Sequence, residues 1–444
     1  MGTAVAARPP AGLLAHRVGL LGTERAFKLV SLIREVEEES GERVVRCNLG
    51  QPDFPLPEHI RTAVKRAIDE GRTGYCDAQG LPELRAAIAR DVGARRGLDV
   101  DPDRVVVYPG ARAPIGFAQQ TYLERGDEVV YPTPGYPLFE SFIEYVGAAP
   151  RPLFLTPESG FTIRGEDLFD AITERTKLVF LNDPSNPTGS VAGTDGLAEM
   201  ARAILATGRE DLRVYSDESY EAILFDGREH ASIASFPRME ERTIIVSGVS
   251  KTYSWTGGRV GWAVYPTVEE AEVHRNLNIN YIASIPPYNQ VGAMVAIESP
   301  ESAPAIRRMV TAFQERRDAV VRALNELPGV SCQLPEGAFY VFPDVSGLLE
   351  RLGALEQHRR LPQGVRENTS PATLFALFLL HRYRVATMDR RSFGVLGSEG
   401  QHFLRVSVAT GLDDLLEAVE RIGRAAEDVA GFEAFVRDGR RLTL

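Results

Sequence analysis

The sequence predicts an α/β protein, with a mostly parallel sheet in a large unit and a second, smaller unit after it. Two observations carry this prediction. Between residues 104 and 264, short apolar runs alternate with helical patterns, which is typical of a mostly parallel sheet. After residue 303, a long helical pattern leads into further strands and helices. A length of 444 residues accommodates two such units.

The chain is expected to begin with a helix, a short strand and two more helices. The first helical pattern ends in an acidic run, and the apolar run of the strand is broken by glycine and proline at residues 50–53. Gly71 and Gly97 supply stop signals for the two following helices. The expected elements are a helix over 23–40, a strand over 44–49, and helices over 57–71 and 81–96.

Six short apolar runs predict buried strands in the large unit. They lie at 105–108, 128–131, 178–181, 213–216, 243–246 and 260–264. Helical patterns separate most of them, at about 112–125, 137–147, 194–207 and 232–236. Sheets of this kind bind ligands in the crevice beyond the carboxyl ends of their strands. The turns that follow these strands are therefore the first place to search for chemistry.

The second unit begins with a helical pattern over 305–327. Residues 346–372 are polar, rich in arginine and weakly periodic. We expect this segment to be an insertion or a mobile loop.

Composition excludes several classes of protein. The net charge of −11 argues against a nucleic-acid-binding surface, which needs a basic patch. No run approaches the ~20 apolar residues that span a bilayer. The three cysteines, Cys47, Cys76 and Cys332, form neither a disulfide framework nor a metal-binding pattern. We expect a soluble cytoplasmic protein without a metal site.

Lysine is rare in this chain, and Lys251 lies at a strand end. Of fifty Lys and Arg residues, only four are lysine, and arginine cannot replace an amine that forms a Schiff base, because its guanidinium stays protonated. Lys251 follows the strand at 243–246 in a Ser/Gly-rich turn, where desolvation would favour the neutral amine that an aldehyde cofactor needs. Arg259 could bind a phosphate in the same pocket. The alternatives are that genomic bias makes lysine rare throughout the chain, and that Lys251 is a surface lysine in a tight turn.

Three other strand ends carry polar groups. Pro109-Gly110-Ala111-Arg112 leads into a helix, whose free N–H groups suit an anion. The loop 182–189 holds two X-Pro steps and could aim the amide of Asn186. Asp217 follows another strand and could hold a pyridinium nitrogen protonated. Each segment also has a plain interpretation, as a turn or a helix cap.

Taken together, these segments resemble a known family. The matching pieces are Asn48-Leu49-Gly50-Gln51-Pro52-Asp53-Phe54, Tyr75 with Gly80-Leu81-Pro82-Glu83-Leu84-Arg85, Pro134-Gly135-Tyr136-Pro137, Asn186-Pro187-Thr188-Gly189, Ser216-Asp217-Glu218 with Tyr220, Ser250-Lys251 to Gly261, and Phe403-Leu404-Arg405-Val406-Ser407. Their order and spacing resemble the fold type I PLP-dependent enzymes, specifically the class I/II aminotransferases related to aspartate and alanine aminotransferases. The resemblance extends from about residue 44 to 425.

The resemblance implies a domain division and a role for each site residue. It implies a large PLP-binding domain at 48–302 and a smaller α/β domain built from both chain ends. Residues 1–47 would form an N-terminal arm and part of the smaller domain, and residues 303–444 would form the rest of the smaller domain. Lys251 would carry pyridoxal 5'-phosphate as a Schiff base and move the substrate's proton. The other implied cofactor contacts are Asp217 at the ring nitrogen, Asn186 and Tyr220 at the phenolic oxygen, Tyr136 on the ring face, and Ala111, Arg112, Ser250 and Arg259 at the phosphate.

Substrate contacts and a dimer are implied as well. Arg405 would bind the substrate α-carboxylate, with Gly50 and Asn186 lining the same end. Tyr75 would reach in from the other subunit of a homodimer with shared active sites. The implied reaction moves an amino group between an L-amino acid and a 2-oxo acid.

Three departures from the family pattern keep an alternative open. Gly248 and Gly258 stand where relatives often have serine and tryptophan, and Arg390 to Gly394 replaces a Pro-Gly-rich loop. With the segment 346–372, these motivate a PLP-dependent lyase, cyclase or oxidative enzyme of a specialised pathway. Residues 280–288, which in relatives of this family can face the partner's active site, contain no Arg or Lys. The resemblance therefore argues against an aspartate-type side-chain clamp from this segment and favours a neutral or aromatic amino donor. A PLP-sensing regulator is the third alternative, but the ~45 residues before the first strand leave no room for a DNA-binding module.

Overall fold

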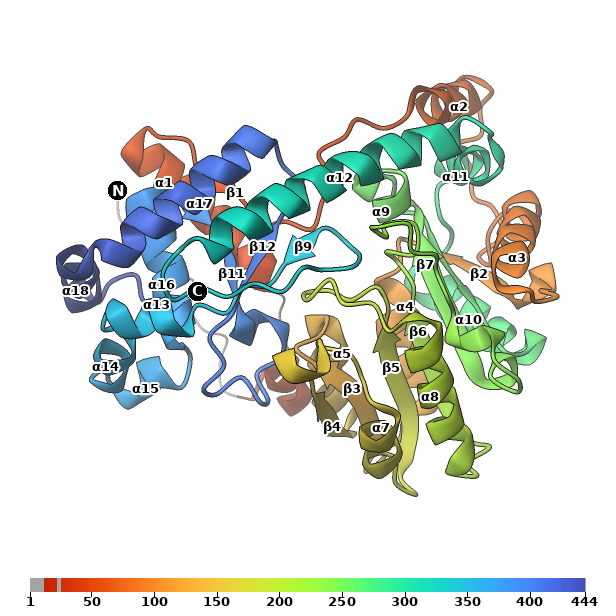
Figure 1. Ribbon diagram of the computed structural model, residues 1–444. Coiled ribbons are helices and arrows are strands. Elements are labelled where there is room, and N and C mark those ends of the chain that lie inside the picture. Colours follow the sequence, from red (N-terminus) through yellow and green to blue (C-terminus); the bar gives the residue numbers. More distant parts are fainter. Residues whose placement is uncertain (1–11, 22–24, 444) are drawn as a thin grey trace.

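The computed structural model describes residues 12–21 and 25–443. The first predicted helix is present as α1 (Arg25–Ser40), and its expected start at Thr23 lies outside the described residues. The α/β fold class is confirmed. Figure 1 shows a large sheet towards one end of the molecule, small sheets towards the other, and α12 (Ser302–Asn325) running between them.

The large sheet contains seven strands in the order β2-β8-β7-β6-β5-β3-β4. They are β2 (Val105–Tyr108), β3 (Glu128–Thr133), β4 (Ala149–Phe154), β5 (Thr176–Asn182), β6 (Arg213–Asp217), β7 (Thr243–Gly248) and β8 (Gly261–Val264). The neighbours from β7 to β4 pair in parallel, whereas β8 pairs antiparallel with both β7 and β2. The six expected strands are all present.

The seventh strand, β4, was not expected. Its sequence contains Pro150 and Pro152, which cannot donate backbone hydrogen bonds and argue against a strand in the middle of a sheet. β4 lies at the sheet edge and pairs only with β3. An edge position tolerates proline because one side of the strand has no ladder to complete.

Alternating side chains of the strands fill cores on both faces of the sheet. Val106 and Tyr108 of β2 belong to one buried cluster, whereas Val105 and Val107 belong to another. This period of two explains why the strands are apolar throughout, as expected for a sheet covered on both faces. The covering helices are α2 (Glu58–Asp69), α3 (Pro82–Arg96), α4 (Ala113–Tyr122), α5 (Pro137–Ser141), α6 (Ile143–Val146), α7 (Gly165–Ala171), α8 (Gly193–Ala206), α9 (Val249–Thr252), α10 (Val268–Tyr281) and α11 (Pro287–Glu298).

The smaller region joins the two parts of the chain that flank the large sheet. β1 (Val45–Arg46) pairs in parallel with β10 (Val385–Ala386). A second small sheet has the order β11-β12-β9, with β9 (Tyr340–Val341), β11 (Met388–Asp389) and β12 (Leu404–Ser407). The helices α17 (Leu412–Glu427) and α18 (Val429–Asp438) pack with α12 around one buried cluster. The domain boundaries at 47/48 and 302/303 stay a prediction.

The segment 346–372 is not a mobile loop in this structure. It forms α13 (Ser346–Arg351), α14 (Ala354–Arg359) and α15 (Gln363–Arg366) and leads into α16 (Pro371–Phe378). Leu348, Leu349 and Ala354 are buried in the core of the smaller region. Helices of four to six residues are too short for a clear apolar period, which explains why a mobile loop was expected. That the segment is an insertion stays a prediction.

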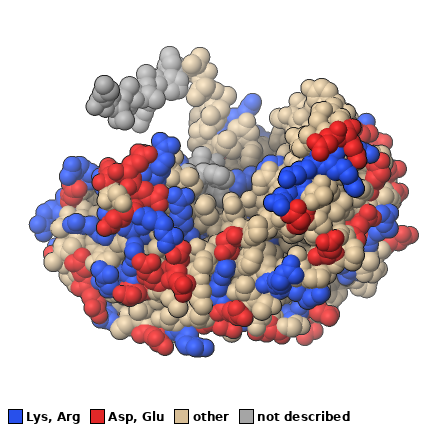
Figure 2. All heavy atoms as spheres, turned by 90° about the horizontal axis from the view of Figure 1, so that it is seen from above, with Lys and Arg blue, Asp and Glu red and all other residues tan. Residues whose placement is uncertain are grey.

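The surface carries charges of both signs. On the face in Figure 2, Lys and Arg side chains are interspersed with Asp and Glu side chains. Within the described part of the chain, no helix combines the length and the apolar character that crossing a membrane requires.

Candidate active site

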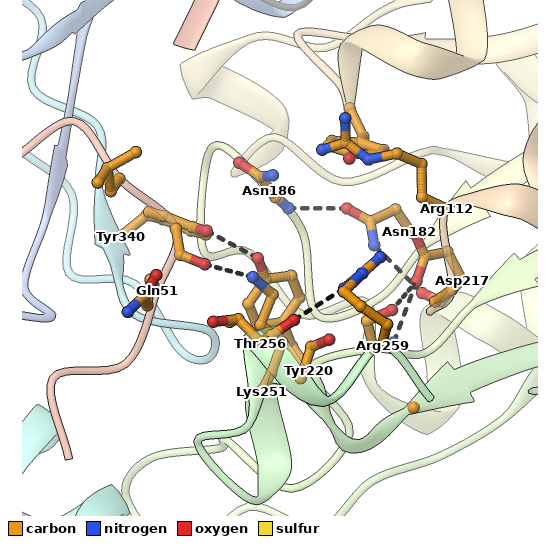
Figure 3. Close-up of a pocket in the computed structure, with 18 of the residues that line it drawn as sticks. Gln51, Arg112, Asn182, Asn186, Asp217, Tyr220, Lys251, Thr256, Arg259 and Tyr340 are labelled. Atoms are coloured by element: carbon orange, nitrogen blue, oxygen red, sulfur yellow. Dashed lines mark hydrogen bonds between the residues drawn. The ribbon is translucent and has the colours of Figure 1, made fainter. Parts of the chain in front are cut away.

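A cavity of about 550 Å³ opens at the carboxyl ends of the central parallel strands. Asn182, Asp217 and Gly248 are the last residues of β5, β6 and β7, and all three line it. β9 and β12 of the smaller region close the cavity from the other side. In Figure 3, Tyr340 and Gln51 approach it from one side and Asp217 and Arg259 from the other. The expected site residues that line it are Gly50, Ala111, Arg112, Tyr136, Asn186, Asp217, Tyr220, Ser250, Lys251, Arg259 and Arg405.

Lys251 lies in α9, directly after β7. Its Nζ donates a hydrogen bond to the carbonyl oxygen of Gly50 and lies 5.8 Å from the ring centres of Tyr220 and Phe339. Gly248 lets the turn that precedes Lys251 approach β8, because a Cβ at Gly248 would lie 2.9 Å from the Cα of Gly261. The turn thus places a primary amine inside the cavity.

Asp217 is a buried carboxylate at the end of β6. The Oδ1 of Asp217 accepts two hydrogen bonds from Ser219, one from the hydroxyl at 2.6 Å and one from the backbone N–H at 3.1 Å. Asn182 donates to the backbone carbonyl of Asp217 at 3.2 Å. Burial raises the pKa of Asp217 to about 6, although the Ser219 hydrogen bonds oppose this shift. A protonated ring nitrogen is the kind of partner that would favour its charged form.

Behind Asp217 lies a buried carboxylate pair, Glu218 and Glu221. Arg96 donates to both carboxylates, His230 contacts Glu218 at 2.7 Å, and Ser247 donates to Glu221 at 2.7 Å. Burial alone would raise the pKa of Glu218, but Arg96 and His230 outweigh burial and hold it well below its usual range. Glu218, Glu221 and His230 lie close enough to hold a metal ion, but the guanidinium of Arg96 already bridges the two carboxylates. This network fixes the chain directly after Asp217.

The other end of the cavity is cationic, and we call Arg112 and Arg259 its cationic end. Arg259 donates to the carbonyls of Pro109 at 2.7 Å and Thr256 at 2.9 Å. Partial burial and the neighbouring charge of Arg112 lower the pKa of Arg259. Gly110, with φ at +86°, allows the close approach, because a Cβ there would collide with the guanidinium of Arg259. Two guanidinium groups at one helix N-terminus form a site for an anion such as phosphate.

Arg405 of β12 lies between two aromatic rings. Its Cζ is 4.3 Å from the ring centre of Tyr340 and 4.7 Å from that of Phe393. It donates to the side-chain oxygen of Asn186 at 2.9 Å and to the carbonyl of Asn48 at 2.5 Å. Its buried Nε has no hydrogen-bond partner among the described residues. Arg405 also lines the cavity, so its guanidinium lies next to the space where a ligand would bind.

Two expected contacts need comment, and Tyr340 and Asn182 are among the lining residues that were missed. Tyr75 is 91% exposed and does not line the cavity of its own chain. The hydroxyl of Tyr220 lies 2.7 Å from that of Tyr340. Tyr340 was missed because an apolar stretch, residues 337–342, predicts a core strand. Asn182 was missed although its place at a strand end was a usable signal.

Comparisons with known proteins agree with this geometry. The family described as Aminotransferase class I and II matches residues 42–422. The chain is 33% identical over 417 residues to a probable aspartate/prephenate aminotransferase of Aquifex aeolicus, covering 94% of this chain and 99% of that relative. It is 32% identical to an aspartate aminotransferase of Bacillus subtilis, covering 93% and 99%. These relatives do not favour the lyase, cyclase or oxidative alternative.

Solved structures show the same relationship. The crystal structure of the aspartate aminotransferase from Rhizobium meliloti superposes with a TM-score of 0.82 at 30% identity, covering 93% of this chain and 98% of that one. An aromatic aminotransferase from Pyrococcus horikoshii superposes with a TM-score of 0.76 at 31% identity, covering 88% and 98%.

The cavity fits the cofactor of this family. An amine, a buried carboxylate and a pair of guanidinium groups line it, and PLP presents an aldehyde, a ring nitrogen and a phosphate to such groups. The family match spans 381 residues (42 through 422), most of the chain. The chain therefore belongs to the class I and II aminotransferases and is a PLP-dependent transaminase that moves an amino group between an amino acid and a 2-oxo acid.

Proposed function

We propose that Lys251 binds the aldehyde of PLP and then carries the proton of the substrate Cα. The observation that carries this proposal is the position of its Nζ in the cavity, beside Gly50 and the ring of Tyr220. When bound, PLP supplies an electron sink for the charge left on the substrate carbon. The residues of the chain bind the reactants, exclude water and move the proton.

The remaining cofactor contacts follow from the places of the side chains around the cavity. Asp217 would hold the proton on the ring nitrogen, and Tyr136 would cover one ring face. Asn186 and Tyr220 would contact the phenolic oxygen. The phosphate would lie at the cationic end. Its proposed ligands are Ala111, Arg112, Ser250 and Arg259, all of which line the cavity.

We propose Arg405 as the group that binds the substrate α-carboxylate. Its guanidinium is buried and lines the cavity, and its Cζ lies over the rings of Tyr340 and Phe393. A planar fork with more than one donor suits a carboxylate. Asn186 and the backbone of Gly50 would line the same end of the cavity.

We also propose a homodimer with shared active sites. Tyr75 is 91% exposed, and Ile279 and Tyr281 are 49% and 64% exposed. Their segments are neighbours, because the Sγ of Cys76 contacts the carbonyl oxygen of Ile285 at 3.4 Å. Exposed large apolar side chains on adjoining segments are typical of an interface. We propose a cytoplasmic location on the ordinary globular composition and the acidic net charge. We propose a place in amino acid metabolism and biosynthesis because class I and II aminotransferases act on amino acids and 2-oxo acids.

A complementation experiment tests the shared site. Purified Lys251→Ala and Tyr75→Ala chains are mixed, dissociated and reassociated. If Tyr75 serves the partner's cavity, half of the sites in mixed dimers regain both residues, and activity appears that neither parent shows. Activity equal to the sum of the parents would refute the shared site. Light scattering on the wild type gives the oligomeric state independently.

Two classes of amino donor deserve direct comparison. The names of the relatives make L-aspartate the first candidate. The absence of Arg and Lys from residues 280–288 favours a neutral or aromatic donor instead. Release of a 2-oxo acid is measured from L-aspartate and L-phenylalanine without an acceptor. One 2-oxo acid per active site supports transamination, whereas continuous ammonia release would contradict it.

A further inference from the structure

Tyr340 lies where the two halves of the cavity meet. It belongs to β9, and only 1% of its surface is exposed. Its hydroxyl lies 2.7 Å from the hydroxyl of Tyr220, and its ring centre lies 4.3 Å from the guanidinium carbon of Arg405. Tyr340 thus contacts Tyr220, which is proposed to bind the cofactor (Figure 3). It also contacts Arg405, which is proposed to bind the substrate.

The hydroxyl pair has a preferred direction once Tyr220 acts on the cofactor. A phenol has one proton to donate. Burial raises the pKa of Tyr220 well above its ordinary value, so that this phenol stays neutral. If Tyr220 donates its proton to the phenolic oxygen of the cofactor, its own oxygen can accept the proton of Tyr340. Donation from Tyr340 then strengthens the donation by Tyr220, because hydrogen bonds in a chain polarise one another.

The surrounding packing holds the Tyr340 hydroxyl in place. Tyr340 pairs with Ser407 across β9 and β12, and its ring lies 4.8 Å from that of Phe339. A Cβ on Gly50 would collide with the Tyr340 hydroxyl and would lie 3.7 Å from the Nζ of Lys251. The glycine is therefore needed to seat this hydroxyl close to the amine.

The ring of Tyr340 acts on Arg405 by a separate route. Arg405 lies between Tyr340 and Phe393, which restrict the plane of its guanidinium. A restricted plane presents the N–H donors in one direction, which favours two-point binding of a carboxylate. This contact needs the aromatic ring but not the hydroxyl.

We infer that Tyr340 is a positioning residue with two separable functions: its hydroxyl directs the hydroxyl of Tyr220 towards the cofactor, and its ring orients Arg405 for the substrate carboxylate. The inference rests on the roles proposed above for Tyr220 and Arg405. It predicts that the two functions respond to different substitutions.

Tyr340→Phe and Tyr340→Leu separate the two functions, with Tyr108→Phe as the matched control. Tyr108 and Tyr265 form another buried hydroxyl pair, at 2.5 Å, and neither lines the cavity. Three kinds of measurement are made on the PLP-loaded enzymes. The first is the pH at which the absorbance band of the bound cofactor is half converted, called the pH midpoint. The second gives kcat and KM, and the third gives the dissociation constants of maleate and hydrocinnamate, which are unreactive carboxylates. Circular dichroism verifies the fold of each variant.

We expect Tyr340→Phe to raise the pH midpoint by about one unit and to lower kcat about tenfold, since one hydrogen bond is lost. A weaker donation by Tyr220 stabilises the negative phenolic oxygen less, so the protonated form persists to higher pH. KM and carboxylate binding should stay within about twofold because the ring remains. Tyr340→Leu should in addition weaken carboxylate binding about tenfold. Tyr108→Phe should match the wild type in the pH midpoint, in kcat and KM, and in carboxylate binding.

Two results would overturn the inference. A pH midpoint in Tyr340→Phe equal to that of the wild type would refute the hydroxyl function. Equal carboxylate binding by the Phe and Leu variants would refute the ring function. Absence of any lysine-dependent band in the wild type would overturn the proposed function itself, and the inference with it.

Discussion

Replacement of Arg405 by lysine tests the proposed carboxylate site with little change in charge. Arg405 uses two N–H groups on Asn186 and Asn48, and its Nε has no partner among the described residues. A lysine ammonium keeps the positive charge. It lacks the planar fork that fits between the rings of Tyr340 and Phe393 and that can hold a carboxylate at two points.

The expected magnitude follows from the contacts that are lost. One charge-assisted hydrogen bond to the substrate contributes about 1.5–3 kcal/mol, and the loss of the stacked geometry adds about 0.5–1 kcal/mol. The total of about 2–4 kcal/mol corresponds to a decrease of about 30- to 1000-fold in kcat/KM. Most of it should appear in KM, because the carboxylate is bound in the ground state and in the transition state alike.

The assay is steady-state release of the 2-oxo acid at saturating PLP. The PLP dissociation constant should change little in Arg405→Lys, since the cationic end is formed by other residues. Arg382→Lys, an exposed substitution nearby in the sequence, serves as the control and should retain wild-type kinetics. A decrease in kcat/KM of less than about threefold, or an equal loss of PLP affinity, would refute the assignment of Arg405.

Three further predictions concern stability and the cofactor. Arg96→Met leaves the carboxylate pair buried without its cation. Denaturant titrations should show a free energy of unfolding lower by about 3–5 kcal/mol. The control Arg90→Met, at an exposed ion pair, should change the free energy of unfolding by less than about 1 kcal/mol. Burial lowers the pKa of His274 to about 4, so the folded state keeps this ring neutral while the unfolded chain takes up a proton below about 6.5. Wild-type stability should therefore fall between pH 6.5 and 4, and His274→Phe should reduce that fall by up to about 3 kcal/mol; identical pH profiles would contradict this. Gly110→Ala should raise the PLP dissociation constant at least about tenfold, because its Cβ meets the cationic end, whereas Gly126→Ala, with the same sign of φ and open space around it, should leave PLP affinity unchanged.

The sequence predicted the strands of the large sheet well because most of them are apolar on both faces. Val105 and Val106 point into different cores and are both fully buried, so the run is apolar without alternation. β4 escaped prediction because Pro150 and Pro152 obey the rule for an edge strand. Sheet order is not encoded in any local pattern, so the edge could not be located beforehand.

The smaller region was harder to predict because its strands are short and its pairings distant. β1 contains two residues and pairs with β10, so that Val45 lies opposite Val385. No local period can reveal a pairing between segments so far apart in the chain. The helices α13 to α15 were missed for another reason. Each spans only one or two turns, which is too short to show an apolar period.

The site residues found from sequence are those with chemistry at strand ends. Asp217 is the last residue of β6, and Lys251 and Asn186 lie shortly after β7 and β5, where ligand groups are expected. Tyr340 could not be distinguished from a core tyrosine, because it is buried in the core and lines the cavity at the same time. The exposure of Tyr75 is visible only in the structure, and the role proposed for it depends on a second chain.

The absorbance spectrum of PLP-loaded protein tests the central proposal most directly, with Lys251→Ala beside the wild type and Lys65→Ala as the control. Lys65 is exposed and remote from the cavity lining. We expect a lysine-dependent absorbance band in the wild type and in Lys65→Ala, absent from Lys251→Ala. In the two proteins with the band, an amino acid donor should release one 2-oxo acid per site. The same band in Lys251→Ala, or its absence from all three proteins, would show that Lys251 does not bind the cofactor aldehyde.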